Sequence, residues 1–279
     1  MKNFFSFSKL TPHLKNIYHR NMTYTTKQVG ETGSLEYRLF FLKDNKPVSS
    51  FHDVPLWVNK EKQIVNMLVE IPRGTNAKLE IATKEYMNPI KQDVKDGKLR
   101  FVHDKYPFNY GALPQTWESP EHTHPSTGAK GDNDPLDACE IGSGQGVTGE
   151  FKQVKVLGVF AMIDAGETDW KILCIDVNDP IASQINSQED IEKHLPGKIN
   201  EVYTFLRDYK IPDGKGPNQF AFDGKLQSID FSMKIIEETE AEWKDLVGGK
   251  TKSSLSVVNT TLNDSNTVTA DVAAQKLNF

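Results

Sequence analysis

Three aspartates fall within six residues in segment 131–137, which reads GDNDPLD. In an extended chain Asp132 and Asp134 would point to the same side. Pro135 stiffens the turn that brings Asp137 back toward them. Three carboxylates this close repel one another unless a cation lies among them, and hard oxygen ligands suit Mg²⁺, Mn²⁺ or Ca²⁺. The segment therefore predicts a divalent-cation site, whereas the plainer interpretation is an acidic surface turn.

A second acidic turn, residues 164–169, lies between two segments with strand character. Asp169 and Lys171 are two residues apart on the second of these segments, so they share one face of a strand. Two acidic turns at strand ends can converge on one metal site. An enzyme that cleaves a polyanion needs such carboxylates to hold metal ions and cations to neutralise the substrate. Further charged residues on or beside strands and turns are Glu70, Lys78, Glu80, Arg100 and Lys210.

Other motifs that bind metals or nucleotides do not fit the chain. In an EF-hand starting at Asp132, the required glycine would be Asp137 and the twelfth-position glutamate would be Ser143. The sequence contains no GxxxxGK[ST] loop, no G-x-S-x-G and no HExxH, and its GxGxxG match at residues 144–149 is a turn that leads into the predicted strand 151–157 instead of opening a helix. A protein that only binds metal would leave the cationic residues unexplained.

Composition limits the class of protein. The chain has 279 residues, 37% of them hydrophobic and 10% aromatic, so it can bury a substantial core. Its formal net charge of −5 argues against general nucleic-acid binding, and no apolar run approaches the ~20 residues that cross a bilayer. Cys139 and Cys174 have no metal-ligand spacing and apolar neighbours, which favours buried free thiols.

The pattern of residues indicates strands first and helices later, which is typical of an α+β domain. Period-two and aromatic segments predict strands, and apolar residues at helical spacing after capping residues predict helices. The predicted strands are residues 34–43, 64–71, 77–81, 98–102, 151–157, 159–163 and 170–177. A loop is expected over residues 106–114. Three helices are predicted. The first begins after Ser187, the second runs from Ile199 to about Tyr209, and the third occupies residues 228–247.

The two ends of the chain differ from its centre. Residues 1–21 carry Lys2, Lys9, Lys15 and Arg20 and no acidic residue, which resembles an amphipathic mitochondrial presequence; a disordered basic tail is the alternative. We therefore expect a mitochondrial matrix location rather than a cytoplasmic one. Residues 250–279 form a polar C-terminal tail, rich in Ser, Thr and Asn from 251 to 269, which we expect to be loosely ordered.

Several motifs in order resemble one family, the soluble family I inorganic pyrophosphatases, and specifically their eukaryotic branch. The segment 132–137 (DNDPLD) matches the family's D-x-D-P-x-D signature. The resemblance extends over residues 22–249, which we take as the catalytic domain. The other matching segments are 51–56 (FHDVPL), 69–73 (VEIPR), 76–80 (NAKLE), 109–118 (NYGALPQTWE), 166–171 (GETDWK) and 209–215 (YKIPDGK).

This resemblance implies a five-stranded, OB-like β-barrel with additional strands and flanking helices, and a homodimer. It also implies Mg²⁺-dependent hydrolysis of inorganic diphosphate to two phosphates, with several ions per site and Mn²⁺ as a possible substitute. The nucleophile would be a metal-bridged water attacking in line, with Asp134 as its general base. Metal ligands would be Asp132, Asp137, Asp164, Asp169, Glu70 and Glu80. Substrate would be bound by Lys78, Arg100, Tyr110, Lys171, Tyr209 and Lys210.

Two places depart from the family's pattern. Gly74 stands where relatives have an aromatic residue that helps to form the dimer contact, which weakens the expectation of a homodimer. The segment between Val102 and Asn109 is a few residues shorter than in relatives. Tyr106 is either a second active-site tyrosine or the replacement for an upstream Phe-Pro step. The alternative function is a catalytically impaired, pyrophosphatase-fold subunit that binds or scaffolds a partner.

Overall fold

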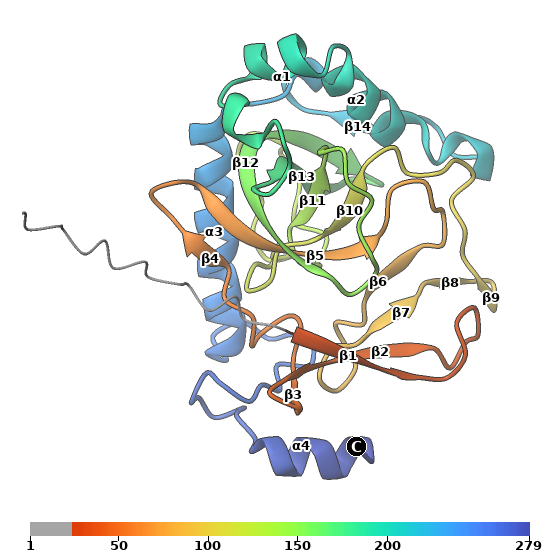
Figure 1. Ribbon diagram of the computed structural model, residues 1–279, viewed down its shortest axis with the longest axis vertical. Coiled ribbons are helices and arrows are strands. Elements are labelled where there is room, and N and C mark those ends of the chain that lie inside the picture. The colour runs from red at the N-terminus through yellow and green to blue at the C-terminus, as the bar shows by residue number, and fades with distance from the viewer. Residues whose placement is uncertain (1–23) are drawn as a thin grey trace, which may run out of the picture.

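The computed structural model describes residues 24–279, so the predicted presequence of residues 1–21 lies outside the described residues. Figure 1 shows a β-barrel at the centre, a second sheet below it in this view, and helices around both. No helix within residues 24–279 is long and apolar enough to span a membrane.

Five strands form the barrel. They are β5 (Ile64–Ile71), β10 (Asn109–Ala112), β11 (Asp137–Glu140), β12 (Phe151–Asp164) and β13 (Glu167–Asp176). Each pairs with the next in the order β5, β10, β11, β13 and β12, and β12 pairs back to β5, which closes a hydrogen-bonded ring. Only β11 and β13 are parallel. Short strands extend the sheet at its margins, namely β4 (Trp57–Asn59) and β14 (Gln219–Phe220). The predicted α+β fold with a five-stranded barrel is confirmed.

A second, smaller sheet lies beside the barrel (Figure 1). Its strands are β1 (Tyr24–Val29), β2 (Arg38–Lys43), β3 (Lys46–Val48), β6 (Leu79–Ile81) and β7 (Ile90–Gln92). Asp44 and Asn45 adopt positive φ in the turn between β2 and β3, as their side chains tolerate. A separate hairpin joins β8 (Val94–Lys95) to β9 (Lys98–Leu99).

Four helices cover these sheets. They are α1 (Gln188–His194), α2 (Lys198–Asp208), α3 (Ile229–Val247) and α4 (Ala270–Leu277). Ser187 caps α1 and Ser228 caps α3, each accepting a backbone N–H three residues on, as the predicted start signals require. The buried Ile235 and Ile236 of α3 pack in one cluster with apolar residues of the barrel strands. Helices α1 and α2 pack in a second apolar cluster with other residues of the barrel strands. Together the two clusters fix the barrel strands in place.

Three predictions about the elements were wrong. Residues 106–114 are not all loop, because β10 lies within them. The two strands predicted over 151–163 are one continuous strand, β12, with an irregular register between Val156 and Gly158. Segment 98–102 is not one continuous strand: it forms the short β9 and an isolated antiparallel bridge between Phe101 and Ala77. Gly111 explains why β10 is hard to recognise: a Cβ there would lie 1.8 Å from the carbonyl oxygen of Leu68, so the position requires glycine, a residue that is depleted in strands.

The C-terminal tail is packed rather than loosely ordered, which corrects the expectation for residues 250–279. Leu255, Asn259 and Ala273 are buried. The carboxylate of Asp53 accepts hydrogen bonds from the backbone N–H groups and hydroxyls of Thr260 and Thr261 at 2.7–3.0 Å. Two of the Thr residues whose polar character suggested disorder, Thr260 and Thr261, therefore bind a buried carboxylate instead.

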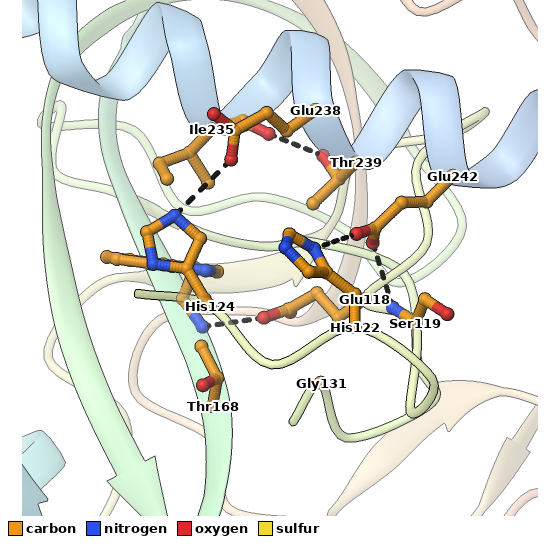
Figure 2. Close-up of a pocket in the computed structure, with 11 residues that line it drawn as sticks. Glu118, Ser119, His122, His124, Gly131, Thr168, Ile235, Glu238, Thr239 and Glu242 are labelled. Carbon is orange, nitrogen blue, oxygen red and sulfur yellow. Dashed lines mark hydrogen bonds and ion pairs between the residues drawn. The ribbon is translucent and has the colours of Figure 1, made fainter. Parts of the chain in front are cut away.

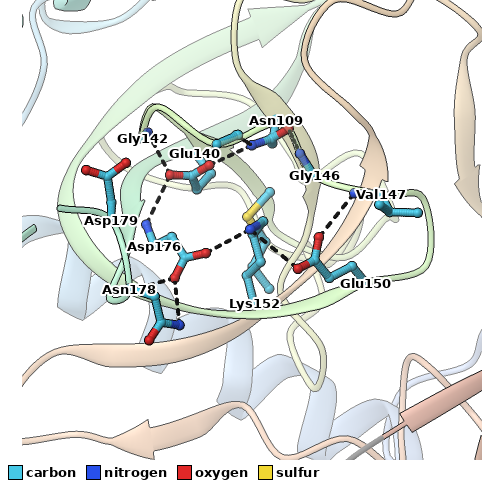
Figure 3. A network of polar contacts seen from close by, with 12 residues as sticks. Asn109, Glu140, Gly142, Gly146, Val147, Glu150, Lys152, Asp176, Asn178 and Asp179 are labelled. Carbon is cyan, nitrogen blue, oxygen red and sulfur yellow. Dashed lines mark hydrogen bonds and ion pairs between the residues drawn. The ribbon is translucent and has the colours of Figure 1, made fainter.

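A network of polar contacts surrounds Glu140, at the end of β11 that is farther from Asp137 (Figure 3). The buried Glu140 accepts from the amide of Asn109 at 2.7 Å and from the backbone N–H of Asp176 at 3.0 Å. Lys152 pairs with Asp176 at 2.7 Å. Each buried carboxylate oxygen of Glu140 thus has a partner, so this network is a structural one.

Candidate active site

One cavity of about 180 Å³ contains the predicted site residues. It is lined by residues at the ends of barrel strands and by residues from β6, the β9 region and the end of α2. Every residue that the sequence proposed for metal, substrate or proton transfer lines this cavity, except Tyr106. The predicted residues that line the cavity are Glu70, Lys78, Glu80, Arg100, Tyr110, Asp132, Asp134, Asp137, Asp164, Asp169, Lys171, Tyr209 and Lys210.

Segment 113–118 holds the turn that carries the three aspartates. The backbone N–H of Glu118 donates to the carbonyl of Asp134 at 2.9 Å, and the N–H of Asn133 donates back to the carbonyl of Glu118 at 2.9 Å. The second acidic turn joins the first through a parallel bridge between Gly131 and Thr168. The two acidic turns therefore converge, as their positions at strand ends predicted.

The turn itself is not extended, which corrects the sequence argument about Asp132 and Asp134. Asn133 between them has φ of 73°, a conformation that asparagine tolerates. The side chain of Asp132 accepts the backbone N–H of Asp134 at 3.0 Å. The two carboxylates still reach the same cavity, because the chain bends around it instead of running along it.

Three carboxyl groups come together at one side of the cavity. Oxygen atoms of Glu118, Asp132 and Asp169 all lie within 4.8 Å of one another. Burial, and then their mutual charges, raise the pKa of Glu118 and of Asp132 well above the ordinary range, and burial raises the pKa of Asp169 to about 7. Carboxylates that oppose one another's ionisation in this way gain most from a bound cation.

Two further acids stand at other walls of the cavity. Burial, followed by the charge of Asp137, raises the pKa of Glu70 to about 8. Asp134 lines the cavity and is an exposed residue, yet the protein atoms around its carboxylate, followed by the charges of Glu80 and Asp137, raise its pKa to about 6.

Lys171 is the most deeply buried of the lysines that line the cavity. Its Nζ lies 2.5 Å from Asp169 and 3.0 Å from the hydroxyl of Tyr110, and it also pairs with Asp137. Burial lowers the pKa of this amine, but the two carboxylates outweigh burial and raise the pKa well above its ordinary value. The hydroxyl of Tyr110 donates a hydrogen bond to Asp137 at 2.5 Å. Lys171 is therefore charged and held in one position.

The remaining cations each have a carboxylate beside them. Lys78 lies 3.6 Å from Glu80, and Lys210 pairs with Asp164. The guanidinium of Arg100 donates to Asp93 at 3.0 Å. All three cations border the same cavity, so an anion inside it would meet positive charge from several directions.

Tyr106 is buried beside the cavity but is not part of its lining. Its ring lies 5.2 Å from that of Tyr110 and 4.7 Å from that of Phe205, within an aromatic cluster. Burial raises the pKa of its hydroxyl to about 12, although the nearby Lys78 opposes this. In this structure Tyr106 supports the wall that carries Tyr110.

Two residues of the site region were missed by sequence reasoning. Glu118 lies within a segment that was used only for its resemblance, and no spacing or periodicity sets it apart from other glutamates. Asp93 precedes a turn, and only the fold brings it to Arg100.

Comparison with known proteins identifies the family. The sequence model described as "Pyrophosphatase: Inorganic pyrophosphatase" matches residues 67–244. The inorganic pyrophosphatase of Yarrowia lipolytica is 54% identical over 258 residues, covering 90% of each chain. This chain belongs to the inorganic pyrophosphatase family.

Solved structures agree with that family membership. The inorganic pyrophosphatase of Schistosoma japonicum superposes with a TM-score of 0.83 at 44% identity, covering 85% of this chain and 86% of that one. A truncated vacuolar soluble pyrophosphatase of Trypanosoma cruzi in complex with PPi superposes with a TM-score of 0.77 at 40% identity, covering 88% of this chain and 98% of that one. The fold of this chain is thus that of the soluble inorganic pyrophosphatases.

Proposed function

We propose that this pyrophosphatase hydrolyses inorganic pyrophosphate to two phosphate ions in the cavity described above. The observation that carries the proposal is the composition of that cavity: carboxylates and cations line one small space, as hydrolysis of a metal-complexed polyanion requires. The related Trypanosoma cruzi protein is described in complex with PPi, which supports the same substrate here.

The residues present fit divalent cations. The donor set is entirely of carboxylate oxygens, which Mg²⁺ and Mn²⁺ prefer. The cluster of Glu118, Asp132 and Asp169 contains a buried Oε2 of Glu118 that has no hydrogen-bond partner among residues 24–279. The proposed ligands are Asp132, Asp137, Asp164, Asp169, Glu70 and Glu80. When bound there, Mg²⁺ would supply charge neutralisation and would make water a nucleophile near neutral pH.

Asp134 is the proposed general base. It lines the cavity at a solvent-exposed position, and its carboxylate is in no ion pair among the described residues. It is therefore free to accept a proton from water as the water oxygen bonds to one phosphorus atom and the bridging P–O bond breaks. The second phosphate leaves with the bridging oxygen.

The cations are proposed to bind and orient the two phosphate groups. Phosphoryl transfer depends mostly on positioning and on neutralising charge. Lys171 is fixed by Asp169 and Asp137, so it does not need to reorganise during the reaction. The other proposed phosphate ligands are Lys78, Arg100, Tyr110, Tyr209 and Lys210.

A phosphate-release assay on the full chain tests this function. The purified protein should release phosphate from pyrophosphate in Mg²⁺ and should lose that activity when the ion is chelated. Restoring Mg²⁺ should restore the activity, and Mn²⁺ should support some of it. No phosphate release from intact, folded protein would contradict the proposal and would favour an impaired subunit that binds a partner.

We also propose a mitochondrial location and a homodimer. The location depends on the basic, acid-free residues 1–21. A fluorescent fusion of the full chain should enter mitochondria, and a fusion of residues 22–279 should remain outside. The homodimer depends on family membership; Gly74, at φ of 77°, has no side chain to contribute. Light scattering on the purified protein would show a dimer or a monomer.

A further inference from the structure

Glu118 is a buried carboxylate that the proposed ligand set does not include. Its side chain is 2% exposed. One oxygen, Oε1, accepts the backbone N–H of Trp170 at 2.9 Å. The other, Oε2, has no hydrogen-bond partner within the described part of the chain. A buried polar atom without a partner is costly, so an unpaired carboxylate oxygen needs an explanation.

Among the described residues, the pocket beside Glu118 has no free positive charge for this oxygen. Figure 2 shows Glu118 at the floor of a small pocket, whose basic side chains are His122 and His124. Both histidines are engaged elsewhere: His122 lies 2.5 Å from Glu242, and His124 lies 3.3 Å from Glu238. The pocket therefore offers Glu118 no cation.

On its other side Glu118 meets the proposed metal site. Its carboxylate lies within 4.8 Å of those of Asp132 and Asp169, both of which line the active-site cavity. Lys171 pairs with Oδ1 of Asp169, but no ion pair in residues 24–279 involves Glu118 or Asp132. Three acidic groups thus share one space in which protein cations balance only part of the charge.

Resting on the function proposed above, we infer that Glu118 is a positioning residue of the metal site, whose Oε2 faces the divalent cation held by Asp132 and Asp169 and strengthens its binding. The ion is of the hard, oxygen-preferring class, Mg²⁺ or Mn²⁺. Groups just outside the ligands typically change metal affinity by ~10–100-fold when they are replaced.

The alternative is that Glu118 serves only the fold, through its bond to Trp170. The substitution Glu118→Gln separates the two, because the amide oxygen still accepts the Trp170 N–H while the charge is removed. The new amide can also donate to Asp132 or Asp169. If Glu118 faces the ion, the metal-free variant should be at least as stable as the wild type, since it relieves repulsion among three carboxylates.

Glu140→Gln is the matched control. Glu140 is equally buried and belongs to the adjoining strand β11, but hydrogen bonds from the protein satisfy both of its oxygens (Figure 3). The control should lower the melting temperature of the metal-free protein, because an amide cannot accept all of these bonds. It should leave the dependence on the ion unchanged.

The experiment is a thermal-unfolding titration of wild type and both variants with Mg²⁺, alongside equilibrium dialysis with Mn²⁺. We expect Glu118→Gln to need about tenfold more ion for half of its stabilisation and to bind Mn²⁺ correspondingly more weakly. Ion dependence equal to that of the wild type would overturn the inference. If Glu118→Gln does not fold, Glu118→Asp decides by the same titration: weaker ion binding supports the inference, and unchanged binding contradicts it.

Wild-type behaviour separates this inference from the proposed function. If the wild type gains no stability from Mg²⁺ and hydrolyses no pyrophosphate, the function and the inference both fail. If the wild type does both and Glu118→Gln shares its ion dependence, only the role of Glu118 fails.

Discussion

Lys171 Nζ lies 2.5 Å from Asp169 Oδ1, two residues earlier on the same face of strand β13. The pair is almost completely removed from solvent, with side chains 3% and 7% exposed. A buried amine held against a carboxylate is a fixed positive charge, and it borders the cavity in which we place the substrate.

Replacing Lys171 should therefore damage catalysis more than it damages the fold. For Lys171→Met we expect kcat/KM for pyrophosphate to fall by ~10²–10³-fold, the usual loss when a preorganised donor is removed. Lys152→Met is the control: Lys152 pairs with Asp176 on neighbouring strands but away from the cavity. It should lose some stability and keep its kcat/KM. Equal kinetics in the two variants would contradict the role of Lys171.

The fold should lose stability as acid is added, through His52. This side chain is fully buried, accepts the indole N–H of Trp243 at 2.9 Å, and bonds to the carbonyl of Ser256 at 2.8 Å. Burial lowers its pKa to about 4. Because the unfolded state then binds the proton more readily, the contribution of His52 is full above pH 6.5 and is lost as pH falls toward 4.

The expected loss from His52 between pH 7.5 and pH 5 is about 2 kcal/mol. Urea unfolding at the two pH values gives the drop in the free energy of unfolding for wild type and for His52→Gln. The difference between the two drops measures the contribution of His52, because the other titrating groups are the same in both proteins. The variant should be less stable at pH 7.5 and should show a smaller drop. An equal drop in both proteins would mean that His52 does not titrate in this way.

The barrel should not tolerate a side chain at position 111. Gly111→Ala should destabilise the protein by about 3 kcal/mol or more, because the Cβ would lie 1.8 Å from the backbone oxygen of Leu68 and would push β10 from β5. Gly144→Ala is the matched control, since no atom lies within 4 Å of its added Cβ. It should be neutral to within about 1 kcal/mol in urea unfolding. Similar losses at both positions would contradict the close approach of these strands.

The C-terminal segment should depend on Asp53. Asp53→Ala removes the acceptor of Thr260 and Thr261, and we expect a loss of about 3 kcal/mol together with rapid proteolysis within residues 250–279. Asp271→Ala, at an exposed position on α4, should cost less than about 1 kcal/mol and should leave proteolysis unchanged. A protease-resistant Asp53→Ala would show that the segment is held by other contacts.

Much of the active site was predictable because its residues lie in short, well-spaced motifs. The two acidic turns contain five of the proposed aspartates, and the second turn lies between two segments that were predicted as strands. Strand β5 was predicted with its observed ends, Ile64 and Ile71, since branched and apolar residues fill six of its eight positions and Pro72 follows. The capped helix α3 was likewise predicted from Ser228 and its apolar spacing.

The closure of the barrel was not predictable from local pattern. Strand β10 has only four residues, one of which is Gly111. Strand β11 begins inside the acidic turn, at Asp137. Their pairing depends on contacts between segments far apart in sequence. Glu118 was missed for the same reason: it reaches Asp132 and Asp169 only through the fold. The C-terminal tail was misjudged because polar composition cannot reveal that Asp53 will bind it.

Asp134→Asn tests the central claim most directly, through its rate of phosphate release from pyrophosphate in Mg²⁺. The carboxamide has nearly the same shape but cannot accept the proton, so we predict that turnover falls by ~10²–10⁴-fold while the variant still unfolds at the wild-type temperature. Glu121→Gln, at an exposed position in the same region of the chain, should keep wild-type turnover. Wild-type turnover in Asp134→Asn would contradict the proposal that Asp134 accepts the proton from the attacking water.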